Sequence, residues 1–170
     1  MNVYLISGKA GSGKNYIANK LYEQLNNSIV TSFSKYIKLF ATELKLWDGN
    51  DNEKPREFLQ NTGDIMRAID DNFLTKRMLE DIKVYKKLGI ENVIINDVRL
   101  KNEIEYMKSS SHKIITIRVN NKKSNRKLSP LEKKHLTETE LDNYKKFDYI
   151  IENQDKNIED IINKIVKGNE

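Results

Sequence analysis

Glycine and lysine are concentrated in residues 8–15, which have the sequence Gly-Lys-Ala-Gly-Ser-Gly-Lys-Asn. Glycines allow backbone amides to curl around phosphate oxygens, and a lysine at this spacing neutralises the β- and γ-phosphates of a nucleotide. The segment therefore predicts a loop that binds the phosphates of ATP. An incidental glycine-rich turn is the alternative, and the apolar run before the loop and the helical pattern after it argue against that. The predicted contacts to ATP from this loop are Gly8, Gly11, Ser12, Gly13, Lys14 and Asn15.

Asn15 departs from the usual pattern G-x-x-x-x-G-K-[ST], in which a hydroxyl at this position binds Mg²⁺. An asparagine oxygen can still bind the ion directly or through water, and Mg²⁺ keeps several waters in most protein sites. We therefore expect ATP and Mg²⁺ as cofactors, with Asn15 as one candidate metal ligand.

A second group of polar residues, Asn96-Asp97-Val98-Arg99, follows the apolar run 93–95. Ligands of parallel sheets bind at the carboxyl ends of the strands. Asp97 is therefore a candidate catalytic group and Mg²⁺ ligand, and Arg99 a candidate catalytic and acceptor-binding group. The alternative is a helix cap at Asp97 with Arg99 paired on the surface.

Arg56, Gln60 and Arg67 are spaced so that one continuous helix would present them on a shared face. Two guanidinium groups and an amide could clamp the phosphate of an acceptor, because arginine binds phosphate through two parallel hydrogen bonds. Gly63 is predicted to interrupt this helix, which leaves the shared face a hypothesis. Ordinary solvated helix residues are the alternative.

The stretch 120–134 is polar, basic and free of aromatic residues, and it contains Arg126. We expect a loop here that could close over the phosphates as a lid, with Arg126 contacting ATP. A solvated basic loop is equally compatible with this charge. Nucleic acid is a less favoured partner, because no aromatic side chains alternate with the basic ones.

Strands and helices alternate along the chain, which predicts an α/β protein with a five-stranded parallel sheet covered by helices on both faces. Helices are predicted from residue 14, around 37–44, from Pro55, over 70–88, around 104–107 and over 158–166, and residues 34–70 form the expected acceptor-binding region. The predicted strands are 3–7, 29–33, 93–95, 114–119 and 148–151.

The composition indicates one globular domain over residues 1–170, with 38% hydrophobic and 32% charged residues. A formal net charge of +5 suits anionic partners such as nucleotides and small phosphates. The chain has no cysteine, no apolar run long enough to span a membrane and no signal-peptide pattern, so we expect a cytoplasmic protein.

Five stretches together resemble the phage and bacterial deoxynucleoside monophosphate kinase family, a group of P-loop kinases related in fold to phosphomevalonate kinase. They are ISGKAGSGKN at 6–15, FSKYIK at 33–38, KPREFLQNTGDIMR at 54–67, VIINDVRLKNEIE at 93–105 and HLTETELDNYKKFDYIIEN at 135–153. The family commonly has Asp after the loop lysine, so Asn15 departs less from this family than from the general pattern. The first stretch is specific to the superfamily, and the other four suggest the family.

The resemblance implies a P-loop kinase-type three-layer fold and a role for several residues. Lys14 would stabilise the transferring phosphoryl group, and Asp97 and Arg99 would lie at the reaction centre. Arg56 and Arg67 would contact the acceptor. Lys38 and Gln60 are further candidate acceptor contacts, and Arg118 is a further candidate contact to ATP. The resemblance assigns no role to residues 135–142.

The function predicted from the sequence is ATP-dependent phosphoryl transfer to a (deoxy)nucleoside monophosphate. A kinase of another small phosphorylated metabolite, such as an isoprenoid phosphate, is the first alternative. A nucleotide-binding module without turnover and a nucleic-acid end kinase are the others, and the absence of N-K-x-D and D-x-x-G argues against a GTPase switch. No membrane partner is expected. The sequence does not decide the oligomeric state, and a homodimer is one of the possibilities.

Overall fold

The computed structural model describes residues 1–50, 53–121, 129–152 and 158–168. Five parallel strands form one sheet in the order β2-β3-β1-β4-β5. The strands are β1 (Asn2–Ser7), β2 (Ser28–Thr31), β3 (Asn92–Val98), β4 (Lys113–Asn120) and β5 (Tyr149–Glu152). This is the five-stranded parallel α/β architecture predicted from the alternation of strands and helices.

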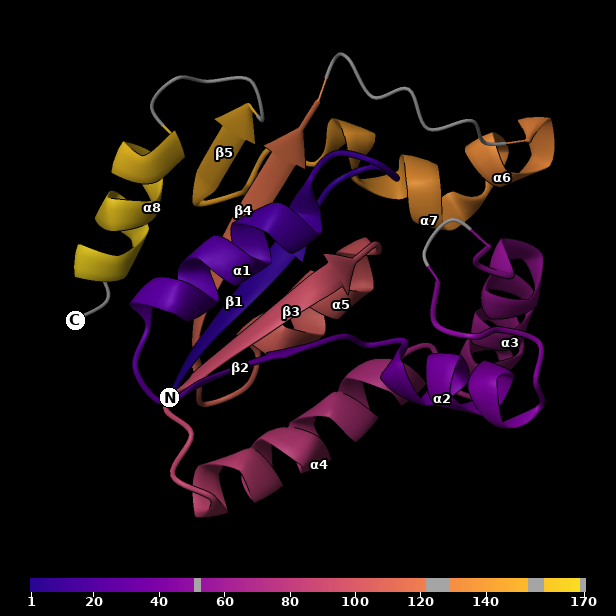
Figure 1. The fold of residues 1–170 in the computed structure, drawn as a ribbon, viewed down its shortest axis with the longest axis horizontal. Helices are drawn as coiled ribbons and strands as arrows, with labels where there is room; N and C mark the ends of the chain where they lie inside the picture. The colour runs from indigo at the N-terminus through magenta and orange to yellow at the C-terminus, as the bar shows by residue number, and fades with distance from the viewer. Residues whose placement is uncertain (51–52, 122–128, 153–157, 169–170) are drawn as a thin grey trace.

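Eight α-helices and one 3-10 helix in the described ranges connect and cover the strands (Figure 1). They are α1 (Lys14–Gln24), α2 (Lys35–Glu43), α3 (Arg56–Ile69), α4 (Phe73–Lys87), α5 (Lys101–Lys108), α6 (Pro130–Lys134), α7 (Leu136–Thr139), η1 (Glu140–Asn143) and α8 (Ile158–Lys167). None of the helices in these ranges is long and apolar enough to cross a membrane.

The central strands β1 and β3 are buried on both faces, as expected when helices cover a parallel sheet on each side. On β1, Val3 and Leu5 face a cluster that includes residues of α2, α4 and α5. Tyr4 and Ile6 face the opposite cluster, to which α1 and α8 contribute. Two separate hydrophobic clusters therefore hold the central strand, and the end of β1 is a rigid support for the loop that follows it.

Helix α3 runs without a break through Gly63, so the predicted interruption is wrong. A glycine inside a helix costs about 1 kcal/mol relative to alanine, which packing can offset. Phe58, Leu59 and Met66 of α3 all pack against the core cluster of α2, α4 and α5. These contacts lie on both sides of Gly63 and explain why the helix continues.

Residues 129–143 contain more regular structure than the composition predicts. Pro130–Lys134 form α6, where a loop was expected, because Ser129 and Glu132 make a reciprocal capping box at its start. Helices α7 and η1 follow directly. Asn120, at the other end of the predicted lid, is the last residue of β4, and residues 122–128, with Arg126, lie outside the described part of the chain.

Candidate active site

Residues 8–14, which we call the phosphate loop, lead from the buried end of β1 into the first turn of α1. Gly8 has no room for a side chain, because a Cβ atom there would lie 2.4 Å from both the Ser12 Oγ and the Val119 carbonyl oxygen. Gly13 precedes the helix with φ of 96°, a left-handed conformation that strongly favours glycine. The glycines of the motif are thus required by the backbone path of this loop.

Lys14 lies across the loop with its ammonium group inside it. The Nζ atom donates to the carbonyl oxygens of Gly8, at 2.6 Å, and of Lys9, at 2.8 Å. Burial, followed by the nearby Arg99 charge, lowers the pKa of Lys14 well below its ordinary value, while Glu138 and Asp97 oppose this shift. A bound polyphosphate would favour the charged form, because it would bring negative charge to a desolvated cation.

A cavity of about 630 Å³ opens between the phosphate loop, the end of β3 and helices α2 and α3. This volume is within the range of small-molecule binding sites. Most of the predicted site residues line it: Gly11, Gly13, Lys14, Asn15, Lys38, Arg56, Gln60, Arg67, Asp97 and Arg99. The structure therefore brings together side chains that are up to 88 positions apart in the chain, from Gly11 to Arg99.

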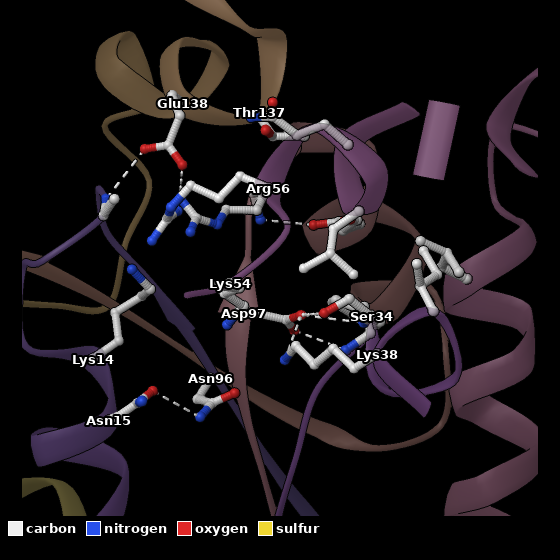
Figure 2. A pocket seen from close by; sticks show the side chains of 18 of the residues that line it. Lys14, Asn15, Ser34, Lys38, Lys54, Arg56, Asn96, Asp97, Thr137 and Glu138 are labelled. Atoms are coloured by element: carbon white, nitrogen blue, oxygen red, sulfur yellow. Dashed lines mark hydrogen bonds and ion pairs between the residues drawn. The ribbon is translucent and has the colours of Figure 1, made fainter. Parts of the chain in front are cut away.

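Asp97 uses both carboxylate oxygens at the turn between β2 and α2. Oδ1 accepts from the Phe33 backbone N–H at 2.7 Å, and Oδ2 accepts from the Ser34 N–H and hydroxyl at 3.1 and 2.6 Å. Burial alone would raise the pKa of Asp97, but Lys38 and these hydrogen bonds outweigh it and lower the pKa below 3.8. Ionised Asp97 thus holds the turn at Phe33 and Ser34, directly before α2, through hydrogen bonds (Figure 2).

Asn96, next to Asp97, faces the phosphate loop. Its Nδ2 donates to the Asn15 Oδ1 at 3.1 Å, so two amide side chains meet at the edge of the cavity (Figure 2). In the described ranges no three His, Cys, Asp or Glu side chains gather to hold a metal ion. The amide oxygens of these asparagines nevertheless suit Mg²⁺, which needs few protein ligands when phosphates and water supply the others.

Arg99 extends from the end of β3 back to the phosphate loop. Its Nη1 donates to the Gly8 carbonyl oxygen at 3.3 Å and to the Glu138 carboxylate at 2.8 Å. Glu103, fully buried below it, accepts from the backbone N–H groups of Arg99 and Leu100 and holds this turn. Burial raises the pKa of Glu103 to about 7.

Helix α3 presents Arg56, Gln60 and Arg67 to the cavity, because it is continuous. Arg67 forms an ion pair with Asp64 at 2.8 Å, and Asp64 also meets His135 Nε2 at 2.9 Å. Arg56 pairs with Glu132 of α6 at 4.0 Å. The helix thus connects the cavity with the segment that includes α6 and α7.

Lys38 of α2 lies on the same side of the cavity as Asp97. Its Nζ donates to the Ser32 hydroxyl at 3.0 Å and is 3.9 Å from the Asp97 Oδ2.

Four predicted residues lie elsewhere. Arg118 donates to the Ser7 hydroxyl at 3.0 Å and to Asp142 at 3.2 Å, in a small hollow behind the phosphate loop that Gly8 also lines. Ser12 is buried inside the loop, with 2% of its surface exposed. Arg126 falls outside the described residues.

Sequence reasoning did not select several residues that line the cavity. Among them are Phe33, Trp47, Lys54, Glu103, Thr137 and Glu138. Phe33, Lys54 and Glu138 belong to stretches that resemble the kinase family, at 33–38, 54–67 and 135–153, but no local pattern assigned them a role. Trp47 comes from a segment without a recognisable motif.

Comparison with known proteins gives a family for this arrangement. The family model described as phosphomevalonate kinase matches residues 6–113, which include the loop at residues 8–14, helix α3 and the end of β3. The chain belongs to the phosphomevalonate kinase family. A phosphomevalonate kinase of Drosophila melanogaster is 29% identical over 136 residues, covering 74% of this chain and 71% of that protein.

Two further proteins are similar to this chain. Uncharacterized protein ORF77 of Ictalurid herpesvirus 1 (strain Auburn) is 31% identical over 141 residues, and the match covers 82% of this chain but 58% of the viral protein. The crystal structure of a sugar kinase from Janibacter sp. HTCC2649 has a TM-score of 0.51 and 12% identity, over 98% of this chain and 92% of that one. The structural likeness shows the fold alone.

Membership in this family makes the chain a phosphotransferase of the P-loop kinase type. The family implies ATP as the phosphate donor and a small phosphorylated metabolite as the acceptor. The resemblance to deoxynucleoside monophosphate kinases is not confirmed by these comparisons. They favour the first alternative of the sequence analysis over its main prediction.

Proposed function

We propose that this protein transfers the terminal phosphoryl group of ATP to the phosphate of a small phosphomonoester, giving a diphosphate. The observation that supports it best is a single cavity lined by Lys14 on one side and by Lys38, Arg56 and Arg67 on the other. Cations at both ends suit two phosphate groups that must be brought together despite their mutual repulsion. Residues 1–170 would act as one catalytic domain, with 34–70 as the acceptor side.

The proposed mechanism requires alignment and charge neutralisation more than proton transfer. An oxygen of the acceptor phosphate attacks the γ-phosphorus of ATP, a new P–O bond forms, and the bond to the bridging oxygen breaks to release ADP. The attacking oxygen is largely ionised at neutral pH, so a strong general base is unnecessary. A mechanism without a general base is compatible with the contacts of Asp97, whose oxygens already accept hydrogen bonds from Phe33 and Ser34.

Lys14 and Arg99 would stabilise the charge that develops on the transferring group, since both reach the phosphate loop. Gly8, Gly11, Ser12, Gly13 and Asn15 would hold the phosphates of ATP, with Arg118 and Arg126 as further contacts. Mg²⁺ would be held near Asn15, and when bound it neutralises phosphate charge. Lys38, Arg56, Gln60 and Arg67 would bind the acceptor.

We favour an acyclic acceptor with a second anionic group, for which mevalonate 5-phosphate is the test compound. Four cationic side chains, counting Lys54, line the acceptor half of the cavity. Three of these cations also pair with acids of the protein, Lys38 with Asp97, Arg56 with Glu132 and Arg67 with Asp64. The choice of mevalonate 5-phosphate therefore rests on the family relation.

A (deoxy)nucleoside monophosphate is the second candidate, and one observation favours it. Trp47 and Phe33 line the same cavity, and the Trp47 indole is held by a hydrogen bond from its Nε1 to the Asn50 carbonyl oxygen at 2.8 Å. A nucleobase could stack on an aromatic ring held in this way.

A panel of acceptors distinguishes these possibilities. Mevalonate 5-phosphate and each ribo- and deoxynucleoside monophosphate are incubated with ATP and Mg²⁺, and every product is resolved separately. We expect one diphosphate to form at the expense of ATP. If ATP is bound but no member of the panel is phosphorylated, the proposed function is wrong.

A further inference from the structure

Helix α7 brings a carboxylate to the phosphate loop, where a kinase would be expected to bind phosphate. The Glu138 Oε2 accepts from the Ala10 backbone N–H at 3.1 Å, and its Oε1 accepts from Arg99 Nη1 at 2.8 Å. Figure 2 shows Glu138 pointing from α7 toward the loop that ends at Lys14. One backbone amide of the loop and one guanidinium group therefore bind the same internal anion.

Glu138 is well shielded from water, with 7% of its side chain exposed. It also lines the cavity, together with Ala10, Lys14 and Arg99. A desolvated carboxylate in this position is compensated by the cations around it, and it in turn favours the charged form of Lys14. The loop thus has an internal counter-ion in Glu138.

The neighbouring contacts hold the segment that bears Glu138 against the loop. Asp142 pairs with Lys9 of the loop at 2.7 Å and with Arg118 at 3.2 Å. On the other side, His135 meets Asp64 of α3 at 2.9 Å. The carboxylate is therefore presented by a segment with attachments at both ends.

We propose that the Glu138 carboxylate occupies the position of a phosphate group of the nucleotide. There it holds the phosphate loop and Arg99 in place, and it has to move away when the polyphosphate binds. The single Ala10 N–H cannot donate a full hydrogen bond to two anions at once, and like charges brought together here repel strongly. Glu138 then sets the nucleotide affinity, because only the fraction of molecules with the carboxylate withdrawn can bind. The inference rests on the proposed function, since it takes residues 8–15 as the place where ATP phosphates bind.

Inorganic tripolyphosphate tests this without acceptor or turnover. Its dissociation constant, and that of ATP, are measured by calorimetry at one salt concentration for the wild type and for Glu138→Gln. We expect Glu138→Gln to bind both about tenfold more tightly, because a neutral amide competes less well for a charge-assisted hydrogen bond. The control is Glu140→Gln on the same segment, whose carboxylate accepts from the Lys101 backbone N–H and does not contact the loop. Its affinities should equal those of the wild type.

Equal or weaker binding of tripolyphosphate by Glu138→Gln overturns the proposal, because Glu138 would then merely hold Arg99 in a binding-competent position. In that case the variant should lower kcat without tightening ATP. Should Glu138→Gln fail to fold, Glu138→Asp retains the charge but withdraws it by one methylene, and the same tightening is expected. Tighter tripolyphosphate binding without any phosphorylated acceptor would support the inference and reject the proposed function. If an acceptor is phosphorylated but Glu138→Gln binds tripolyphosphate as the wild type does, the proposed function is supported and the inference about Glu138 is rejected.

Discussion

The guanidinium group of Arg67 lies over Gly63, one turn earlier in α3. A Cβ atom on Gly63 would be 3.1 Å from the Arg67 Nη1 and 3.2 Å from its Nη2. These contacts are closer than ordinary van der Waals distance, so any larger residue at position 63 has to displace the guanidinium group. A methyl group at position 63 would therefore move the Arg67 guanidinium by a few tenths of an ångström.

The variant Gly63→Ala should separate stability from acceptor binding. Alanine is the better helix former and should raise the free energy of unfolding by up to about 1 kcal/mol. The displaced Arg67 should raise the KM for the acceptor about tenfold, the cost of one weakened phosphate contact. Urea unfolding and steady-state kinetics measure the two effects.

Ala68→Gly is the matched control, because Ala68 is exposed on the same helix and does not line the cavity. It should lose about 1 kcal/mol of stability and leave the acceptor KM unchanged. An unchanged KM in Gly63→Ala would show that the position of Arg67 over Gly63 does not matter for acceptor binding.

Some of this site could be predicted from the sequence because its signals are local. The turn at Gly8 and Gly13, the lysine inside it and the helix after it lie within one short segment. The end of β3 was also predictable, since an apolar run followed by Asp97 and Arg99 marks a strand edge in a parallel sheet. The fold was predictable because the alternation of strands and helices is also a local signal in the sequence.

The rest depends on tertiary contacts that local patterns do not encode. The hydrogen bond between Ala10 and Glu138 joins residues 128 positions apart. Asp97, a predicted metal ligand, also accepts hydrogen bonds from a turn 63 and 64 positions earlier, and no local pattern indicates this contact. At Gly63, helix propensity indicated a break, and packing of the residues on both sides overrode it.

Asp97→Asn should destabilise the protein in a pH-dependent manner. The folded state lowers the pKa of Asp97 below 3.8, so ionised Asp97 stabilises the fold above that pH and this contribution is lost as the pH falls through the folded pKa. The variant should lose about 1–3 kcal/mol near pH 7, and the difference from the wild type should shrink below pH 3.8. Urea unfolding over a pH series measures it, with the exposed Asp71→Asn as control. A difference that is constant down to pH 2 or so contradicts this account.

Glu103→Gln should act in the opposite direction. The folded state raises the pKa of Glu103 from 4.5 to about 7, so the folded protein binds this proton more tightly and the wild type loses stability as the pH rises through that window. A pKa shift of this size corresponds to a loss of at most about 3 kcal/mol in the free energy of unfolding of the wild type. Gln can still accept from the Arg99 and Leu100 N–H groups, so the variant should be more stable than the wild type at pH 8 and equal to it near pH 4.5.

The pH series for Glu103→Gln is compared with Glu57→Gln, an exposed glutamate at the start of α3. That control should follow the wild type at every pH. If Glu103→Gln is the less stable protein throughout, the hydrogen bonds need a full negative charge and Glu103 is ionised in the folded state at neutral pH.

Lys14→Ala should abolish phosphoryl transfer without unfolding the protein. The ammonium group binds the carbonyl oxygens of Gly8 and Lys9, which water can bind in its place, and the apolar core does not depend on it. Its charge would act on the transferring phosphoryl group, and loss of one such group should lower turnover at least about 100-fold. Lys20→Ala, on the same helix, removes an amine that pairs with Glu159 away from the cavity and should keep wild-type turnover. Product formation with the acceptor identified by the panel, together with thermal unfolding of both variants, provides the test. Near-normal turnover in Lys14→Ala would remove the catalytic role of the loop, because the ammonium group of Lys9, the other lysine of the loop, pairs with Asp142.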